Sequence, residues 1–217
     1  MRKAVINKTD LTNFLIINCL ESQGVNCDEV DYFLKQYDIN LRSDHRNFLI
    51  KYANNTSLLT SMFADCTFEQ FKKYYSAYLF SDELHDDEKI PFGTSYFGHD
   101  FNDEFLCIDH NTGEIFVYGY EEKSSPASYK NIDSFLVYSF FWHQENEQYF
   151  EIVEKEIQIQ EQNKFKSNYG KNEVKDLCGY CFQCYIKDQE LYIADFSRGY
   201  YSLYKGGILN LLNRAII

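Results

Sequence analysis

Residues 105–118, FLCIDHNTGEIFVY, decide the fold class of this 217-residue chain. Two apolar runs, Phe105–Ile108 and Ile115–Tyr118, flank a polar turn that contains Gly113. Short runs of aromatic and branched side chains on either side of a glycine-containing turn predict a β-hairpin. The sequence therefore predicts an antiparallel sheet in the middle of the chain.

Helical spacing of apolar residues surrounds this hairpin. On its N-terminal side we expect four helices, with Asp10, Ser43 and Thr67 as helix caps. The apolar residues that define these helices lie within Leu11–Cys19, Val30–Tyr37, Phe48–Tyr52 and Phe68–Leu79. On its C-terminal side, Ile132–Phe140 returns to the same spacing. This order predicts an α+β fold, with a mostly antiparallel sheet packed against helices.

The last third of the chain predicts a helix, a hairpin and a short terminal helix. Residues 144–162 carry one apolar stripe at helical spacing, which favours an amphipathic helix. A polar break over 163–172 separates it from a second hairpin, with strands at 180–186 and 191–196 and a turn between them. A short helix is expected over 208–217, after Gly206-Gly207. We therefore predict a domain over residues 1–142 and a C-terminal extension over 143–217.

The charge of the chain is strongly negative, with 33 acidic against 21 basic residues and a net charge of −12. Direct binding to nucleic acid needs clustered Lys and Arg, so this balance argues against it. Ten acidic residues lie between 81 and 120, where Lys89 is the only basic residue. One interpretation is a solvated surface. The other is a docking surface for a basic protein, because aromatic residues alternate with the acids, as in an apolar contact with a charged rim.

The closest approach to a metal motif is Cys178, Cys181 and Cys184 within seven residues. Zinc needs four ligands, and alternation along a strand would place Cys181 on the opposite face from the other two. We expect core or edge cysteines here, with these three as weak metal candidates, and no cofactor. The 7 cysteines of the chain predict reduced thiols. Four of them are expected to be buried: Cys19, Cys27, Cys66 and Cys107.

A thiol–imidazole pair is conceivable between Cys107 and either His99 or His110. Cys107 lies in a strand-like apolar run, where a buried, unreactive thiol is expected, and both histidines are expected in solvent. The sequence contains no nucleophile elbow, phosphate-binding loop, zinc-protease helix or dinucleotide-binding glycine motif. We therefore expect no enzymatic activity.

The N-terminal segment does not resemble a secretory signal. Asp10, Asn13 and Asn18 flank or interrupt its apolar run, and no small-residue cleavage site follows. No apolar stretch has the length of a membrane span. A cytoplasmic location is therefore expected, with no membrane contact.

A set of motifs in residues 28–142 resembles the SUKH superfamily, which contains bacterial immunity proteins and relatives of a fungal cell-wall synthesis regulator. The motifs are Phe48–Asn55, Ile90–Gly93, Phe105–Asp109, Gly113–Tyr118 and Ile132–Leu136. The sequence differs from the usual family pattern at Asn54-Asn55, where the family has Gly-Gly, and at Leu41-Arg42, where it has Leu-Pro. The resemblance implies a non-enzymatic α+β protein that neutralises a toxin by binding it.

The leading hypothesis is a bacterial immunity protein that binds a cognate polymorphic or contact-dependent toxin, such as a nuclease or another toxin with a basic cleft. The expected contacts combine acidic rim residues with aromatic anchors: Asp86, Asp87, Asp100, Asp103 and Glu104, with Tyr96 and Phe101. One alternative is a regulatory or scaffold protein that binds a host factor. Another is a metal- or thiol-dependent enzyme centred on the three clustered cysteines.

Overall fold

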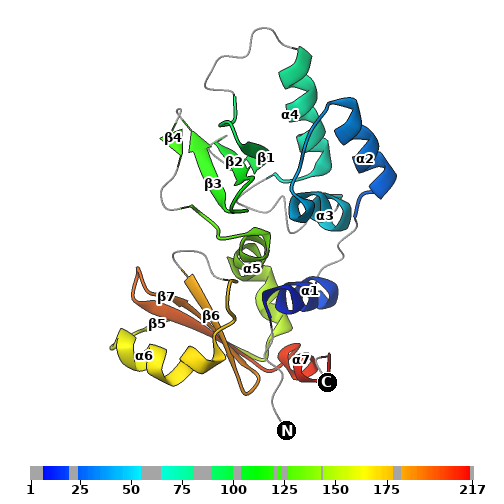
Figure 1. Cartoon of the computed structure of the whole chain (residues 1–217). Coiled ribbons are helices and arrows are strands. Elements are labelled where there is room, and N and C mark those ends of the chain that lie inside the picture. Colours follow the sequence, from blue (N-terminus) through cyan, green and yellow to red (C-terminus); the bar gives the residue numbers. More distant parts are fainter. Residues whose placement is uncertain are drawn as a thin grey trace.

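The fold contains two antiparallel sheets with helices between and around them, and the α+β prediction is confirmed (Figure 1). This computed structural model describes residues 7–19, 24–54, 65–80, 89–99, 104–119, 122–123, 127–142, 144–177 and 182–215. Among these residues, no helix has the length and apolar character needed to cross a membrane.

The N-terminal helices are α1 (Lys8–Cys19), α2 (Cys27–Gln36), α3 (Ser43–Tyr52) and α4 (Phe68–Phe80). Of the three helix caps predicted from the sequence, one is confirmed. Thr67 Oγ1 accepts a hydrogen bond from Gln70 N (3.2 Å), as predicted for α4. Asp10, by contrast, lies inside the first turn of α1, where its N–H donates to Asn7 Oδ1 (2.9 Å). Arg42 occupies the cap position of α3 and makes no side-chain capping bond, so Asp10 and Ser43 are not the caps.

The first sheet has the order β1-β2-β3-β4. Its strands are β1 (Thr94–His99), β2 (Phe105–Asp109), β3 (Ile115–Gly119) and β4 (Glu122–Lys123). The predicted hairpin forms β2 and β3, which pair Phe105 with Tyr118 and Ile108 with Ile115. Alternate residues such as Leu106 and Ile108 point into the main core.

Helix α5 (Ile132–Trp142) lies between the two sheets, and α1 lies against it (Figure 1). Nearly all of its length is apolar, and buried residues occur around its whole circumference, as expected for a central helix. Phe135 contacts Phe97 of β1 on one side (5.0 Å between ring centroids), and Ser134 Oγ donates to Leu177 O of the C-terminal region on the other. One continuous core therefore joins residues from both sides of position 142.

The second sheet has the order β5-β8-β7-β6. Its strands are β5 (Ile152–Gln158), β6 (Phe182–Lys187), β7 (Glu190–Asp195) and β8 (Tyr200–Lys205), and α7 (Leu209–Ala215) follows. Successive side chains of its strands point to opposite faces, so the sheet contributes to two separate cores. Leu191 and Tyr204 face the main core, whereas Tyr192 and Leu203 face a smaller core under α6 (Gln162–Tyr169), around Phe165.

The hairpin and the terminal helix predicted for the last third are confirmed in the described residues. The amphipathic helix over 144–162 is wrong, because the chain forms a 3-10 helix, η2 (Gln144–Tyr149), and then β5. The polar break expected over 163–172 is wrong as well. That segment contains most of α6, followed by the 3-10 helix η3 (Gly170–Asn172).

Candidate functional site

A groove of about 410 Å³ lies beside the start of β1. Four parts of the chain line it: residues 37–40, which connect α2 to α3, Tyr74 and Tyr75 of α4, residues 90–95, and His110. The lining therefore combines aromatic rings with polar side chains, and among the described residues Asp38 is its one carboxylate. This is the general composition of a ligand-binding or protein-binding groove.

Two tyrosines of α4 fix this helix against the sheet. Tyr74 OH accepts a hydrogen bond from Ile90 N (3.3 Å), and Tyr75 OH accepts one from Tyr96 N (3.2 Å). The Tyr74 ring also stacks on Tyr96, with centroids 4.2 Å apart and an angle of 8° between the planes. The aromatic wall of the groove is therefore held by both hydrogen bonds and ring packing.

The segment before β1 presents Phe92, whose side chain is fully exposed. Gly93 follows with φ 81°, a conformation that favours glycine, and its carbonyl accepts a hydrogen bond from His110 N (2.9 Å). Thr94 Oγ1 donates to Pro91 O (2.7 Å) and closes the turn. An exposed phenylalanine thus projects from a backbone that is tied at both ends.

Asp38 lies where α2 ends, with φ 50°, a region that aspartate tolerates better than most residues. Backbone bonds from Asp38 N to Lys35 O (3.4 Å) and from Ile39 N to Leu34 O (2.9 Å) hold this turn. The Asp38 side chain is exposed and, in the described part of the chain, forms no ion pair. Three other acids of α2 and α3 are paired, Glu29 with Lys72, Asp31 with Arg46 and Asp44 with Arg42, whereas Asp28 forms no ion pair among the described residues.

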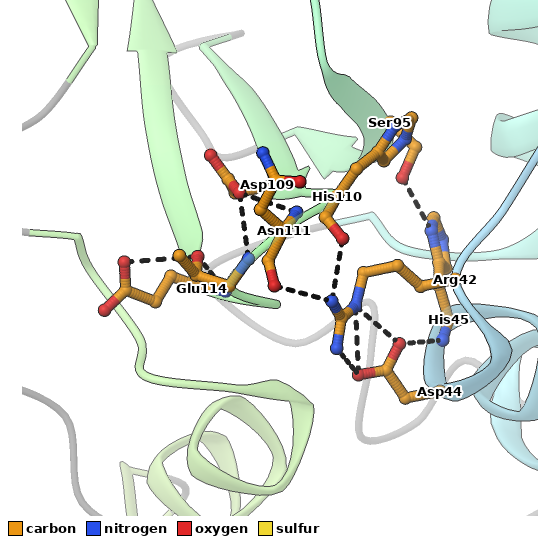
Figure 2. A network of polar contacts seen from close by, with 9 residues as sticks. Arg42, Asp44, His45, Ser95, Asp109, His110, Asn111 and Glu114 are labelled. Carbon is orange, nitrogen blue, oxygen red and sulfur yellow. Dashed lines mark hydrogen bonds and ion pairs between the residues drawn. The ribbon is translucent and has the colours of Figure 1, made fainter.

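Behind the groove, Ser95 and His45 form a buried polar pair (Figure 2). Ser95 Oγ lies 3.0 Å from His45 Nδ1, and the imidazole packs edge-on against Phe71 and Phe97. Burial lowers the pKa of His45 to about 3, Asp44 partly opposes the shift, and His110 adds to it. His45 is therefore neutral at physiological pH.

Arg42 joins α3 to the β2–β3 turn (Figure 2). Its Nη1 donates to His110 O (2.8 Å) and Asn111 O (3.3 Å), while Nε and Nη2 contact the Asp44 carboxylate. Partial burial acts to raise the pKa of Asp44, but the hydrogen bonds and charge of Arg42, together with the hydrogen bond from His45 N and the charge of His45, outweigh it and the pKa is lowered. The turn that carries His110 is thus fixed to the helix that carries His45.

This arrangement is poorly suited to nucleophilic catalysis at Ser95. A general base works best with a pKa near the operating pH, and the pKa of His45 lies far below it. The other ring nitrogen, His45 Nε2, has no hydrogen-bond partner among the described residues, and Asp44 accepts from the His45 backbone N–H instead (2.9 Å). No third group therefore orients the ring as in a catalytic triad. The geometry supports a binding groove on a rigid base.

The contact residues expected from the sequence fall into two groups. Asp86, Asp87, Asp100, Phe101 and Asp103 lie outside the described residues. Glu104 is half-buried just before β2.

Tyr96 is only 1% exposed, because it lies in β1 under Tyr74 and Phe105. The prediction of Tyr96 as an anchor is therefore wrong, and among the described residues of this region Phe92 is the large aromatic side chain that faces solvent.

The cysteines give no sign of a metal centre within the described part of the chain. Cys178 and Cys181 lie outside it, and Cys184 is fully buried in β6. Burial of Cys19, Cys66 and Cys107 is confirmed, whereas Cys27 is exposed at the start of α2.

The expectation that the two histidines considered beside Cys107 lie in solvent is wrong, because both are half-buried. His99 Nδ1 lies 3.1 Å from Tyr96 OH, and His110 is half-buried in the groove, with its Nε2 shielded from solvent. Among the described residues, His110 Nε2 has no hydrogen-bond partner.

The sequence did not point to the groove as a unit. Asp38, Tyr74 and His110 come from segments far apart in the chain, so no spacing links them. The one local signal was Pro91-Phe92-Gly93, where an aromatic residue lies between two turn-forming residues.

Comparison with protein-family models, curated proteins and solved structures gives no match to this chain.

Proposed function

We propose that this protein is a cytoplasmic immunity protein that binds and neutralises a cognate polymorphic or contact-dependent toxin with a basic cleft, such as a nuclease. The observation that carries the proposal is the uneven charge. Residues 1–142 contain 22 acidic and 12 basic residues, whereas residues 143–217 contain 11 and 9. The negative charge is thus concentrated in the region that has the groove and the exposed Phe92.

The packing of the SUKH-like motifs supports the same proposal. Phe48 of α3, Ile108 of β2 and Phe135 of α5 belong to one core, so the motifs that carry the resemblance form one structural unit. Arg42 connects the first of these elements to the hairpin through the carbonyls of its turn. An antiparallel sheet on helices is the fold that the resemblance implies.

An acidic surface would act on a basic toxin in two ways. It would compete with phosphate for the cationic cleft, and it would speed association by long-range attraction, with rate constants of up to roughly 10⁸–10⁹ M⁻¹s⁻¹ at low salt. Charge would raise the association rate, and apolar anchors such as Phe92 would slow dissociation. The proposal therefore predicts an association rate that falls steeply with ionic strength.

The test uses the product of the adjacent gene. We expect co-expression of the full chain to relieve growth inhibition by a neighbouring toxin, and the purified pair to form a one-to-one complex by analytical ultracentrifugation. Failure to relieve toxicity, with no complex at micromolar concentrations, would contradict the proposal. A specific complex with an endogenous host protein, whose activity it changes, would instead favour a regulatory role.

A further inference from the structure

The groove beside β1 has the features of a receptor for one cationic side chain. We propose that it receives an arginine of a protein partner, with the guanidinium at Asp38 and Asn40 and its flat face against the aromatic lining. That the partner is a basic protein rests on the proposed function, whereas the binding of an arginine side chain is argued from the groove itself.

The charges around the groove favour a cation. Asp38 is exposed and, within the described residues, has no ion pair, whereas the nearby acids Glu29, Asp31 and Asp44 each have a basic partner. Among the described residues that line the groove there is no Lys or Arg. Asn40, two residues beyond Asp38, adds an exposed side-chain carbonyl to the same lining. An incoming cation would therefore meet hydrogen-bond acceptors from this lining.

The aromatic lining favours arginine over other cations. Tyr37, Tyr74 and Tyr75 line the groove together with the fully exposed Phe92. A guanidinium is planar, weakly hydrated and able to stack on aromatic faces while its N–H groups donate to a carboxylate. The more compact and strongly hydrated ammonium of lysine fits such a surface less well.

The rigidity of the lining favours binding because little conformational entropy is lost. Tyr74 and Tyr75 are fixed by the hydrogen bonds that they accept from Ile90 and Tyr96, and Gly93 is tied to His110. The volume of about 410 Å³ is within the usual range for small-ligand sites, so one side chain with part of its backbone would fit.

The first experiment titrates the full-length ¹⁵N-labelled protein with Nα-acetyl-L-arginine methylamide. We expect saturable shifts of the Gly93, Ser95 and His110 amides, and no saturation with the neutral citrulline analogue. Asp38→Asn should weaken binding about fivefold. Asp188→Asn is the matched control, because Asp188 is also an exposed aspartate with φ 50° but lies in the turn between β6 and β7, away from the groove. It should leave binding unchanged. Equal binding of the citrulline analogue, or shifts elsewhere only, would overturn the proposal.

The second experiment separates this inference from the proposed function. In a complex with the neighbouring toxin, Phe92→Ala and Asp38→Asn should each raise the Kd about tenfold, while Asp188→Asn should not change it. Toxin binding that neither substitution affects would overturn the groove as the docking site and leave the immunity function in place. Saturable arginine binding at the groove without any toxin binding would support the groove and contradict the immunity function.

Discussion

The two sheets contain similar hairpins whose turns are fixed in different ways. The β2–β3 turn is held within itself, because Asp109 Oδ1 accepts hydrogen bonds from Asn111 N (2.9 Å) and Thr112 N (3.0 Å), and from outside, by Arg42 at the His110 and Asn111 carbonyls. The β6–β7 turn is a two-residue turn. Lys187 and Glu190 are the last strand partners before it, and the two residues between them have φ of 50° and 70°. Such a turn matches the twist of a hairpin, and its flanking residues also contact other elements, Lys187 at the Tyr169 ring and Glu190 at Lys205. Both turns therefore have local support, and the first is also tied to α3 by charge-assisted bonds from Arg42.

The two sheets also differ in what their surroundings leave exposed. In the second sheet the main core covers one face and α6 the other, but the edge strand β5 is exposed over most of its length (Figure 1). Beside the first sheet, the groove leaves Asp38 and Phe92 in contact with solvent. The region over 1–142 also carries most of the excess negative charge. The groove and most of the excess negative charge therefore lie in the same region of the chain.

The largest effect is expected from Phe135→Ala, which tests whether the two regions fold together. Phe135 is buried in α5, between the sheets, and contacts Phe97 and Tyr129. Truncation should cost about 3–5 kcal/mol. Urea unfolding followed by far-UV circular dichroism and by Trp142 fluorescence should show one coincident transition. Two separate transitions would mean that the regions fold independently. Ile17→Ala, on the exposed side of α1, should change stability by less than about 0.5 kcal/mol.

Arg42→Gln tests the external support of the first turn. It removes charge-assisted bonds from a half-buried guanidinium, so a loss of about 2 kcal/mol is expected. The matched substitution Arg198→Gln affects an exposed arginine 3.7 Å from Asp195, in the β7–β8 turn. It should cost less than about 0.5 kcal/mol. Equal shifts of the two urea midpoints would show that Arg42 supports its turn no more than an exposed arginine does.

The buried His45 predicts a specific acid sensitivity in the N-terminal region. Its pKa is lowered to about 3 in the folded protein, so the unfolded chain, with an ordinary histidine pKa near 6.5, binds more protons. Stability should therefore fall as the pH drops from about 6.5 toward 3, by on the order of 1–2 kcal/mol at pH 5. His45→Asn, which keeps a polar atom near Ser95 but cannot be protonated, should flatten the dependence of the urea midpoint between pH 7 and pH 5. An unchanged slope would contradict this assignment.

The smallest effect is expected at the second turn. Gln189 has φ 70°, a conformation that costs a non-glycine residue roughly 1 kcal/mol or more. Gln189→Gly should therefore stabilise the protein by about 0.5–1 kcal/mol, with a rise in Tm of a few degrees by calorimetry. A fall in Tm would show that the Gln189 side chain makes contacts that outweigh the strain.

The sequence predicted those elements whose pattern is local. Both hairpins combine apolar runs with turn residues, and α4 combines the Thr67 cap with helical spacing. Strand β5 was missed for a physical reason. It is an edge strand exposed over most of its length, and its register shifts between Glu154 and Ile157, where Glu156 has φ 56°. The bulge breaks the alternation and leaves the apolar residues at helical spacing.

The candidate site was less predictable because folding assembles it from separate segments. The sequence showed that acidic and aromatic residues alternate near position 92, but not that Tyr96 points inward and Phe92 outward. Nor does any pattern reveal that, within the described residues, Asp38 forms no ion pair while Glu29, Asp31 and Asp44 do. Such features depend on which side chains meet across the fold.

The contact between α1 and α5 also has a consequence for synthesis on the ribosome. Thr9 Oγ1 donates to Asp133 Oδ2 across 124 positions of sequence, and the apolar side of α1 packs on α5. At 5–20 residues per second, α1 is translated roughly 6–25 s before the helix that buries it. Leu11, Phe14 and Leu15 therefore lack their final packing partner throughout that interval. Nascent chains of this protein should be clients of ribosome-associated chaperones until α5 has emerged.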